Sequence, residues 1–256
     1  MKWKRNIEKL YPALLMIMIS IILWEFLVRI FHIEIWILPA PTDIIQAFRK
    51  ESAILLDNTL VTLYEALVGF LFAILVAMIL AVIIDQFSFF KRGFYPILIA
   101  SQTVPIIAIA PLLMIWFGYG LLPKVVVVTL VCFFPIVLST VDGFNQADSG
   151  LIALLQTMNA TKWQVFKKVR FPSALPSFFS GLRIAATYSI MGAVIGEWLG
   201  ANKGLGIYMK NASHSFLTDQ VFAAILVIVF TSILFFGILL LIEQYFIPWA
   251  RSNYEE

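Results

Sequence analysis

Few residues in this chain have the chemistry of a catalytic or metal centre. The two histidines, His32 and His214, lie in different polar segments, and neither belongs to an HExxH, CxxC or GxSxG pattern. Ser213 precedes His214, but adjacent loop residues rarely face one another, so we expect no hydrolytic dyad. The single cysteine, Cys132, cannot form an internal disulfide and is expected to pack within a helix. We predict no catalytic residue, no metal site and no cofactor.

Five ionisable residues lie in or beside long apolar stretches: Glu25, Glu65, Arg183, Glu197 and Glu243. Such charges are costly in a bilayer and usually face a cavity or a partner. We expect Glu25, Glu65 and Glu243 near membrane interfaces, and Arg183 either reaching lipid phosphates or forming a structural salt bridge. Because the glutamates are scattered along the sequence, we expect isolated charges within the membrane.

The composition predicts that these residues belong to a membrane protein. Hydrophobic residues make up 61% of the chain and charged residues 13%, and the mean hydropathy is +0.94. A soluble globule of this composition would lack the polar residues to cover its surface, so lipid is the expected solvent.

The apolar stretches are the right length for membrane helices. A hydrocarbon core of about 30 Å needs about 20 helical residues. Six stretches qualify: residues 11–31, 60–84, 95–117, 123–141, 177–199 and 221–247. They lack the alternation of barrel strands, which predicts an all-α polytopic integral membrane protein with six transmembrane helices.

Lysines and arginines predict the orientation. With six spans both termini lie on one side, and that side carries about twice as many basic residues as the other, which places both termini and residues 150–176 in the cytoplasm. The first stretch is too long for a signal peptide and no small-residue cleavage site follows it, so we expect it to be retained. The net charge of +3 reflects this topology, and no basic stripe predicts nucleic-acid binding.

The segment between the fourth and fifth stretches is longer and more basic than a turn requires. Residues 150–176 read GLIALLQTMNATKWQVFKKVRFPSALP, enough for two short helices. Leu151, Leu154, Leu155 and Met158 recur at helical spacing and predict an apolar face that fits a groove on a partner. Asn159 follows, and Asn can end a helix in the left-handed conformation. An amphipathic helix in the membrane interface is the alternative interpretation.

This segment resembles the coupling loop of permease subunits in binding-protein-dependent ABC importers. That loop carries Glu-Ala-Ala, three residues, Gly and later an Ile-x-Leu-Pro-like ending. The Glu-Ala-Ala positions fall here on Ala153, Leu154 and Leu155, the Gly on Asn159, and the ending on residues 169–172, which close with Pro172. The carboxylate is missing at Ala153, so contact with an ATPase would depend on shape and apolar surface.

Other stretches resemble the branch of these permeases that includes sulfonate, taurine, nitrate and thiamine-pyrimidine-precursor permeases. They are residues 38–48, 59–70, 105–118 and GEWLGANKGLGIYM at 196–209. The resemblance implies the type I ABC importer permease fold. It divides the chain into residues 1–56, with a cytoplasmic tail, the first helix and an outer loop; a five-helix core, 57–247, containing the coupling loop 142–176; and a cytoplasmic tail, 248–256.

The resemblance implies a transport subunit and not an enzyme. The chain lacks a GxxxxGK[ST] loop, so ATP hydrolysis would belong to a separate subunit. The implied partners are two cytoplasmic ATPase subunits, an extracellular solute-binding protein and a second permease subunit, expected to be an identical copy. The complex would sit in a bacterial cytoplasmic membrane and work by alternating access driven by ATP binding and hydrolysis.

The resemblance also places the fifth helix beside the translocation path. We expect Tyr188, Ser189 and Glu197 to contact solute or close a gate, with a tight helix interface at the dimer seam as the alternative. Gly204 and its neighbours predict a sharp outer turn, which either receives the binding protein or is an ordinary solvated connection.

The resemblance also implies a class of solute. Residues 196–209 most resemble permeases for thiamine pyrimidine precursors of the formylaminopyrimidine or hydroxymethylpyrimidine type. A sulfonate such as taurine, or nitrate, is the alternative. An alternative of another class is a stand-alone channel or ion-coupled carrier, which paired intramembrane charges or broken helices with ion ligands would favour. A membrane enzyme comes third, because the catalytic set is missing.

Overall fold

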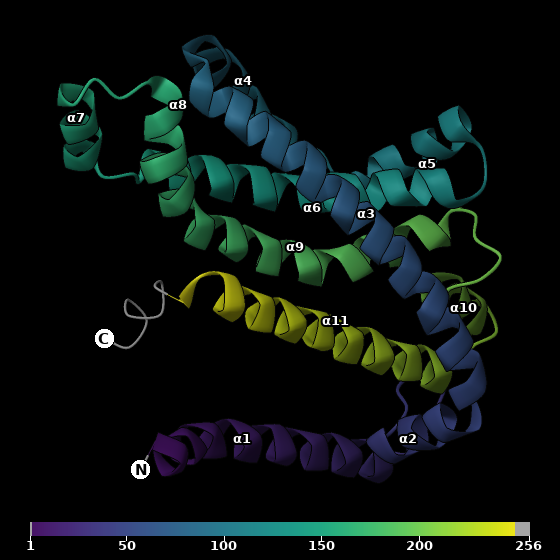
Figure 1. Cartoon of the computed structure of the whole chain (residues 1–256). Coiled ribbons are helices and arrows are strands. Elements are labelled where there is room, and N and C mark those ends of the chain that lie inside the picture. Colours follow the sequence, from purple (N-terminus) through teal and green to yellow (C-terminus); the bar gives the residue numbers. More distant parts are fainter. Residues whose placement is uncertain (1, 249–256) are drawn as a thin grey trace. The chain divides into compact units, whose positions relative to one another are not determined.

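The computed structural model describes residues 2–248, and the side chains of residues 11–248. Within that part of the chain the protein consists of helices and no strand (Figure 1), which confirms the predicted all-α class. The elements are α1 (Lys2–Ile30), α2 (Pro41–Lys50), α3 (Ser52–Gln86), α4 (Ser88–Ser101), α5 (Ile106–Phe117), α6 (Leu121–Asn145), α7 (Ser149–Thr157), α8 (Lys162–Val165), a π-helix η1 (Phe166–Arg170), α9 (Phe171–Trp198), α10 (Leu205–His214) and α11 (Thr218–Phe246).

Five of the described helices are long and apolar enough to cross a membrane. They are residues Tyr11–Ile30 of α1, then α3, α6, the continuous run Lys162–Trp198, and α11. A sixth span results if α4 and α5 count together, although they bend by 98° at the break between them. The predicted span 95–117 is therefore not one straight helix. Pro105 explains the break, because a proline disfavours helical geometry in the preceding residue and begins α5 as its N-cap.

The described chain divides into two compact units. The N-terminal unit combines the residues up to Asn58 with Tyr208–Val227, and the core unit combines Thr59–Ile207 with the residues from Ile228 onward. The predicted tail 248–256 lies outside the described residues except for Pro248, and the basic side chains of the first ten residues lie outside the described side chains.

In the N-terminal unit, polar side chains join α1 to α2. Glu25 Oε2 accepts a hydrogen bond from the backbone N–H of Thr42 at 3.0 Å, in the first turn of α2. Arg29 bridges Glu25 Oε1 at 3.1 Å and Asp43 Oδ1 at 3.0 Å. A carboxylate at a helix N-terminus is favoured by the helix dipole, so Glu25 stabilises the start of α2 together with Asp43.

In the core unit, α6 and α9 pack closely along their lengths (Figure 1). Glycines lie where their backbones meet: a Cβ atom added to Gly181 would be 2.7 Å from the carbonyl oxygen of Pro135, and one added to Gly143 would be 2.9 Å from Cα of Ala174. Cys132 is buried at this contact and donates from Sγ to the carbonyl oxygen of Ala185 at 3.3 Å, as a packing residue would. The small residues of α9 thus permit close helix packing.

This packing predicts opposite effects for two Gly→Ala substitutions. Gly181→Ala places a methyl group against the α6 backbone, and we expect it to lower stability by about 1–3 kcal/mol, the usual cost of overpacking. Gly237→Ala in α11 meets no atom within 4 Å, so it should leave the melting temperature unchanged or raise it through helix propensity. Thermal unfolding of the detergent-purified variants measures both. Equal melting temperatures would contradict the packing account.

Candidate functional site

The segment between α6 and α9 contains two short helices with well-defined starts. Asp148 caps α7, since its Oδ1 accepts from the backbone N–H of Gly150 at 2.7 Å and of Leu151 at 3.2 Å. Thr161 and Gln164 form a capping box that begins α8. Asn159 lies between them with φ 57°, the left-handed geometry that the sequence predicted for it. The second helix does not end, because α8 continues through the π-helix into α9.

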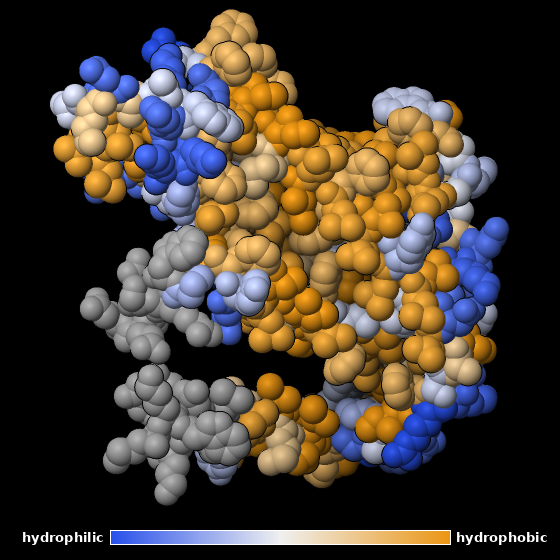
Figure 2. Space-filling model, in the orientation of Figure 1, coloured by the Kyte–Doolittle hydropathy of each residue, from blue (hydrophilic) through white to orange (hydrophobic). Residues whose placement is uncertain are grey.

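Two leucines of α7 and the methionine that follows the helix are exposed. No residue of α7 is buried, and Leu151, Leu154 and Met158 are 50%, 56% and 70% exposed. Leu155 is half-buried, whereas Ala153 is exposed, and Pro172 is half-buried in the first turn of α9. Figure 2 shows hydrophobic surface on α7 beside the hydrophilic surface of the basic residues that follow. The helix therefore presents a preformed apolar face.

Glu197 lies in a buried polar cluster at the far end of α9. Its Oε1 accepts from the hydroxyl of Thr62 at 2.7 Å, and its Oε2 accepts from the backbone N–H of Gly206. The oxygen of Thr62 in turn accepts from the backbone N–H of Leu205 at 2.9 Å. Thr62 and Glu197 thereby satisfy two N–H groups in the first turn of α10.

The glycine-rich turn is packed against this carboxylate. Gly204 has φ +125°, and a Cβ atom there would lie 2.2 Å from Cδ of Glu197. Gly204 and Gly206 are buried, while Lys203 is exposed. The turn that connects α9 to α10 is thus held in place from inside the core unit.

The expectation of isolated intramembrane charges is wrong. Glu65 and Lys124 are both buried and form an ion pair, with Nζ 2.6 Å from Oε1. Arg183 pairs with Glu243 of α11, and Arg170 pairs with Asp85 of α3. Arg183 therefore forms the salt bridge that was one of its two predicted roles. Spacing along one helix cannot reveal these pairs, because the partners come from helices far apart in the sequence.

The predicted path residues lie on different faces of α9. Ser189 is fully buried and donates to the carbonyl oxygen of Ala186 at 2.8 Å, whereas Tyr188 is 44% exposed. Tyr188 and Glu197 are nine residues apart, a rotation of about 180° around an α-helix, so the structure does not bring them together. Sequence reasoning missed Thr62, Lys124 and Asp85. The only available signal was a polar residue near the end of a long apolar stretch.

Comparison with known proteins is consistent with this architecture. The family model described as binding-protein-dependent transport system inner membrane component matches residues 69–252. The formylaminopyrimidine transport permease protein ThiX of Halalkalibacterium halodurans is 36% identical over 251 residues, covering 98% of this chain and 100% of the relative. The taurine transport system permease protein TauC of Escherichia coli is 32% identical over 154 residues, covering 60% of this chain and 56% of the relative.

A solved structure shows the same fold. A chain of the MetNI methionine ABC transporter, in an inward-facing conformation, matches with a TM-score of 0.67 and 19% sequence identity, covering 77% of this chain and 97% of that chain. The predicted type I importer permease fold is therefore confirmed. Because the family model matches more than half of the chain and ThiX is similar over nearly all of it, the chain belongs to the family of binding-protein-dependent transport system inner membrane components and is an ABC importer permease.

Proposed function

We propose that this permease imports a thiamine pyrimidine precursor of the formylaminopyrimidine or hydroxymethylpyrimidine type. The similarity to ThiX, at 36% identity over 98% of the chain, is the observation that supports this solute. The taurine relative matches only 60% of the chain, and SsuC of Bacillus subtilis, named as an aliphatic sulfonates transport permease protein, matches 95% of it at 26% identity, so a sulfonate, or nitrate, is the second candidate. The buried ion pairs and the break between α4 and α5 are features of carriers and channels as well, but family membership favours the importer.

The proposed complex contains two cytoplasmic ATPase subunits, an extracellular solute-binding protein and a second copy of this chain. Both termini lie in the cytoplasm of a bacterial cell, with the coupling loop on the same side. The exposed Lys162, Lys167 and Lys168 beside α7 support this orientation by the positive-inside rule. The family match begins at residue 69, which supports a permease core at 57–247 preceded by an added first helix.

In this complex α7 is the contact for the ATPase. Its exposed apolar face, Leu151, Leu154 and Met158, is already partly covered, so burying it in a groove gains about half of the roughly 1.5–3 kcal/mol that full burial of one such side chain contributes. Leu155 and Ala153 lie on the same helix, and Asn159 turns the chain after it. Pro172 lies in the first turn of α9, which continues toward the membrane. The contact relies on apolar area, since Ala153 supplies no carboxylate.

At the other end of α9, Glu197 has the role of a gate residue. It holds the turn between α9 and α10 through Gly206, and its partner Thr62 belongs to α3. Ser189 lies eight residues earlier, within about 80° of the same face, and Tyr188 lies on the opposite, exposed face where solute or a second copy can reach it. A movement of α3 relative to α9 therefore moves the turn.

Transport by the reconstituted complex tests the solute. Proteoliposomes containing this permease, its ATPase and its binding protein should accumulate labelled hydroxymethylpyrimidine or formylaminopyrimidine when ATP is present, and should exclude taurine. Uptake of taurine without uptake of either pyrimidine would replace the first solute with the second.

Leu154→Asp should detach the ATPase, because it places a charge where an apolar groove is expected; Leu154 is exposed, so the permease itself should fold. The matched control is Gln156→Asp, which adds the same charge about 160° away around α7. Size-exclusion chromatography of the co-expressed subunits measures the complex. Co-elution of the ATPase with the Leu154→Asp permease at the wild-type ratio would contradict the proposal that α7 contacts the ATPase.

Glu197→Gln should slow uptake without preventing assembly. The glutamine amide has one acceptor oxygen in place of two, so it can accept from Thr62 or from Gly206 but its NH₂ group cannot accept from the other. It also loses the negative charge that faces the first turn of α10. Initial uptake rates and complex yield, compared with those of the wild type, separate the two effects. An unchanged uptake rate would show that Glu197 is a packing residue and not a gate residue.

A further inference from the structure

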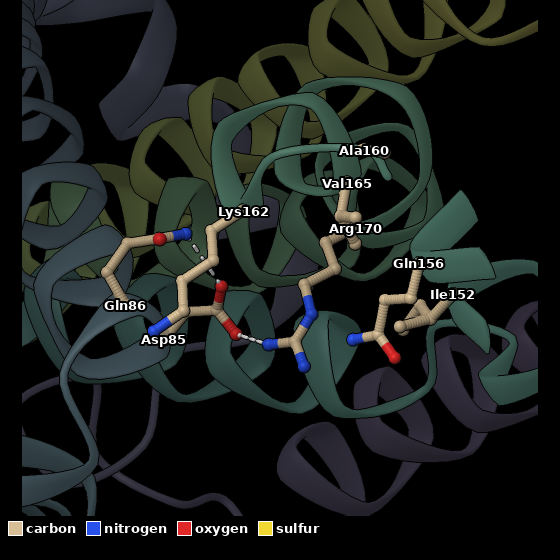
Figure 3. Close-up of a pocket in the computed structure, with 8 residues that line it drawn as sticks. All are labelled: Asp85, Gln86, Ile152, Gln156, Ala160, Lys162, Val165 and Arg170. Carbon is tan, nitrogen blue, oxygen red and sulfur yellow. Dashed lines mark hydrogen bonds and ion pairs between the residues drawn. The ribbon is translucent and has the colours of Figure 1, made fainter. Parts of the chain in front are cut away.

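An ion pair joins the last turn of α3 to the coupling segment, which consists of α7, α8 and the π-helix (residues 149–170). A guanidinium nitrogen of Arg170 contacts Oδ1 of Asp85, and Gln86 donates from Nε2 to the other carboxylate oxygen at 3.2 Å (Figure 3). The side chain of Asp85 is 2% exposed and that of Arg170 is 34% exposed. In the closed pair the carboxylate is therefore far less accessible to water than the guanidinium.

Arg170 occupies a distinctive place in the backbone. It is the last residue of the π-helix Phe166–Arg170, which connects α8 to α9. Short π-helices are uncommon and occur frequently at functional sites. The start of this turn is anchored by aromatic contacts of Phe166 with Phe144 and Trp163, at ring-centroid distances of 5.6 and 5.4 Å. A movement of α8 is thus passed directly to the position of Arg170.

A cavity of about 230 Å³ lies beside the ion pair. Its lining comes from α7, with Ile152 and Gln156, from α8, with Lys162 and Val165, and from the ends of the ion pair itself (Figure 3). The cavity separates part of the α7–α8 hairpin from the end of α3, so these parts are not tightly packed there. The charge contact joins these parts beside the apolar cluster that contains Ile84 of α3 and Phe166 of the π-helix.

Helix α3 carries a second ion pair, far from Asp85 along the helix. Glu65 and Asp85 are 20 residues apart, about 30 Å along an α-helix, which equals the thickness of a hydrocarbon core. Glu65 pairs with Lys124 of α6. Helix α3 therefore carries two ion pairs about one membrane thickness apart, and the Asp85 pair is the one that reaches the coupling segment.

We propose that the Asp85–Arg170 ion pair transmits movement of the coupling segment to α3, so that both are positioning residues for the transport cycle. The proposal rests on the proposed function, because it takes α7 as the ATPase contact. Separation of the pair would leave the largely enclosed Asp85 carboxylate without its cationic partner, which is costly, so α3 follows the π-helix when α7 and α8 move. Closure of the ATPases thereby moves α3 and with it Thr62, which lies toward the other end of that helix. Because Thr62 is bonded to Glu197, the turn between α9 and α10 moves as well.

The test compares uptake with ATP hydrolysis in the reconstituted complex. Asp85→Asn removes the buried charge, so the complex should assemble and hydrolyse ATP, but solute taken up per ATP should fall about tenfold, within the usual range for coupling between sites. The charge-swapped double variant Asp85→Arg, Arg170→Asp should recover part of the ratio. Glu243→Gln, which breaks the Arg183 pair away from the coupling segment, should lower thermal stability and leave the ratio unchanged.

A wild-type ratio in Asp85→Asn would overturn the proposal. If the wild-type complex shows no ATP-dependent uptake at all, the proposed function fails, and a second measurement judges the connection by itself. Spin labels on exposed Phe87→Cys and Lys167→Cys, in a Cys132→Ala background, report the distance between the end of α3 and the π-helix. Asp85→Asn should broaden this distance distribution, and an unchanged distribution would overturn the connection.

Discussion

The close approach of α6 and α9 is the constraint on which the core unit depends. Lipid provides no hydrophobic force between helices, so their association relies on packing at small residues and on polar contacts. Gly143 and Gly181 let the two backbones meet, and Gly196 lies against Lys124, where a Cβ atom would be 3.2 Å from Cα of that lysine. This contact brings Lys124 beside the end of α9 and makes the polar cluster around Glu197 possible.

Ion pairs with enclosed carboxylates then link α3 and α11 to the central pair and to the π-helix beside it. A charge within a bilayer or a protein interior is costly unless it is paired, and removing one partner costs more than the pair contributes. Glu65 and Asp85 attach α3, and Glu243 attaches α11. The same logic explains the contrast between the two ends of the core unit: polar groups are enclosed around Glu197, whereas α7 leaves apolar side chains exposed. The first arrangement holds a turn in place, and the second is suited to a partner.

Much of this architecture could be predicted from the sequence, because it depends on local signals. Apolar length predicts the spans, the helical spacing of leucines predicts the face of α7, and Asn159 predicts its end. The pairing of Glu65 with Lys124 could not be predicted, since it depends on which helices become neighbours. The break between α4 and α5 was hidden by the apolar residues on both sides of Pro105, although the proline itself was a signal. The burial of Gly204 against Glu197 likewise depends on tertiary packing.

Lysine crosslinking of the native membranes, followed by purification of the permease in mild detergent and mass spectrometry, tests the central claim most directly. Lys162, Lys167 and Lys168 are exposed beside α7, so they report what contacts the coupling segment. The account predicts crosslinks from these lysines to a P-loop ATPase, with a solute-binding protein recovered in the same complex. An intact, crosslinked sample in which these lysines link to no ATPase would contradict it.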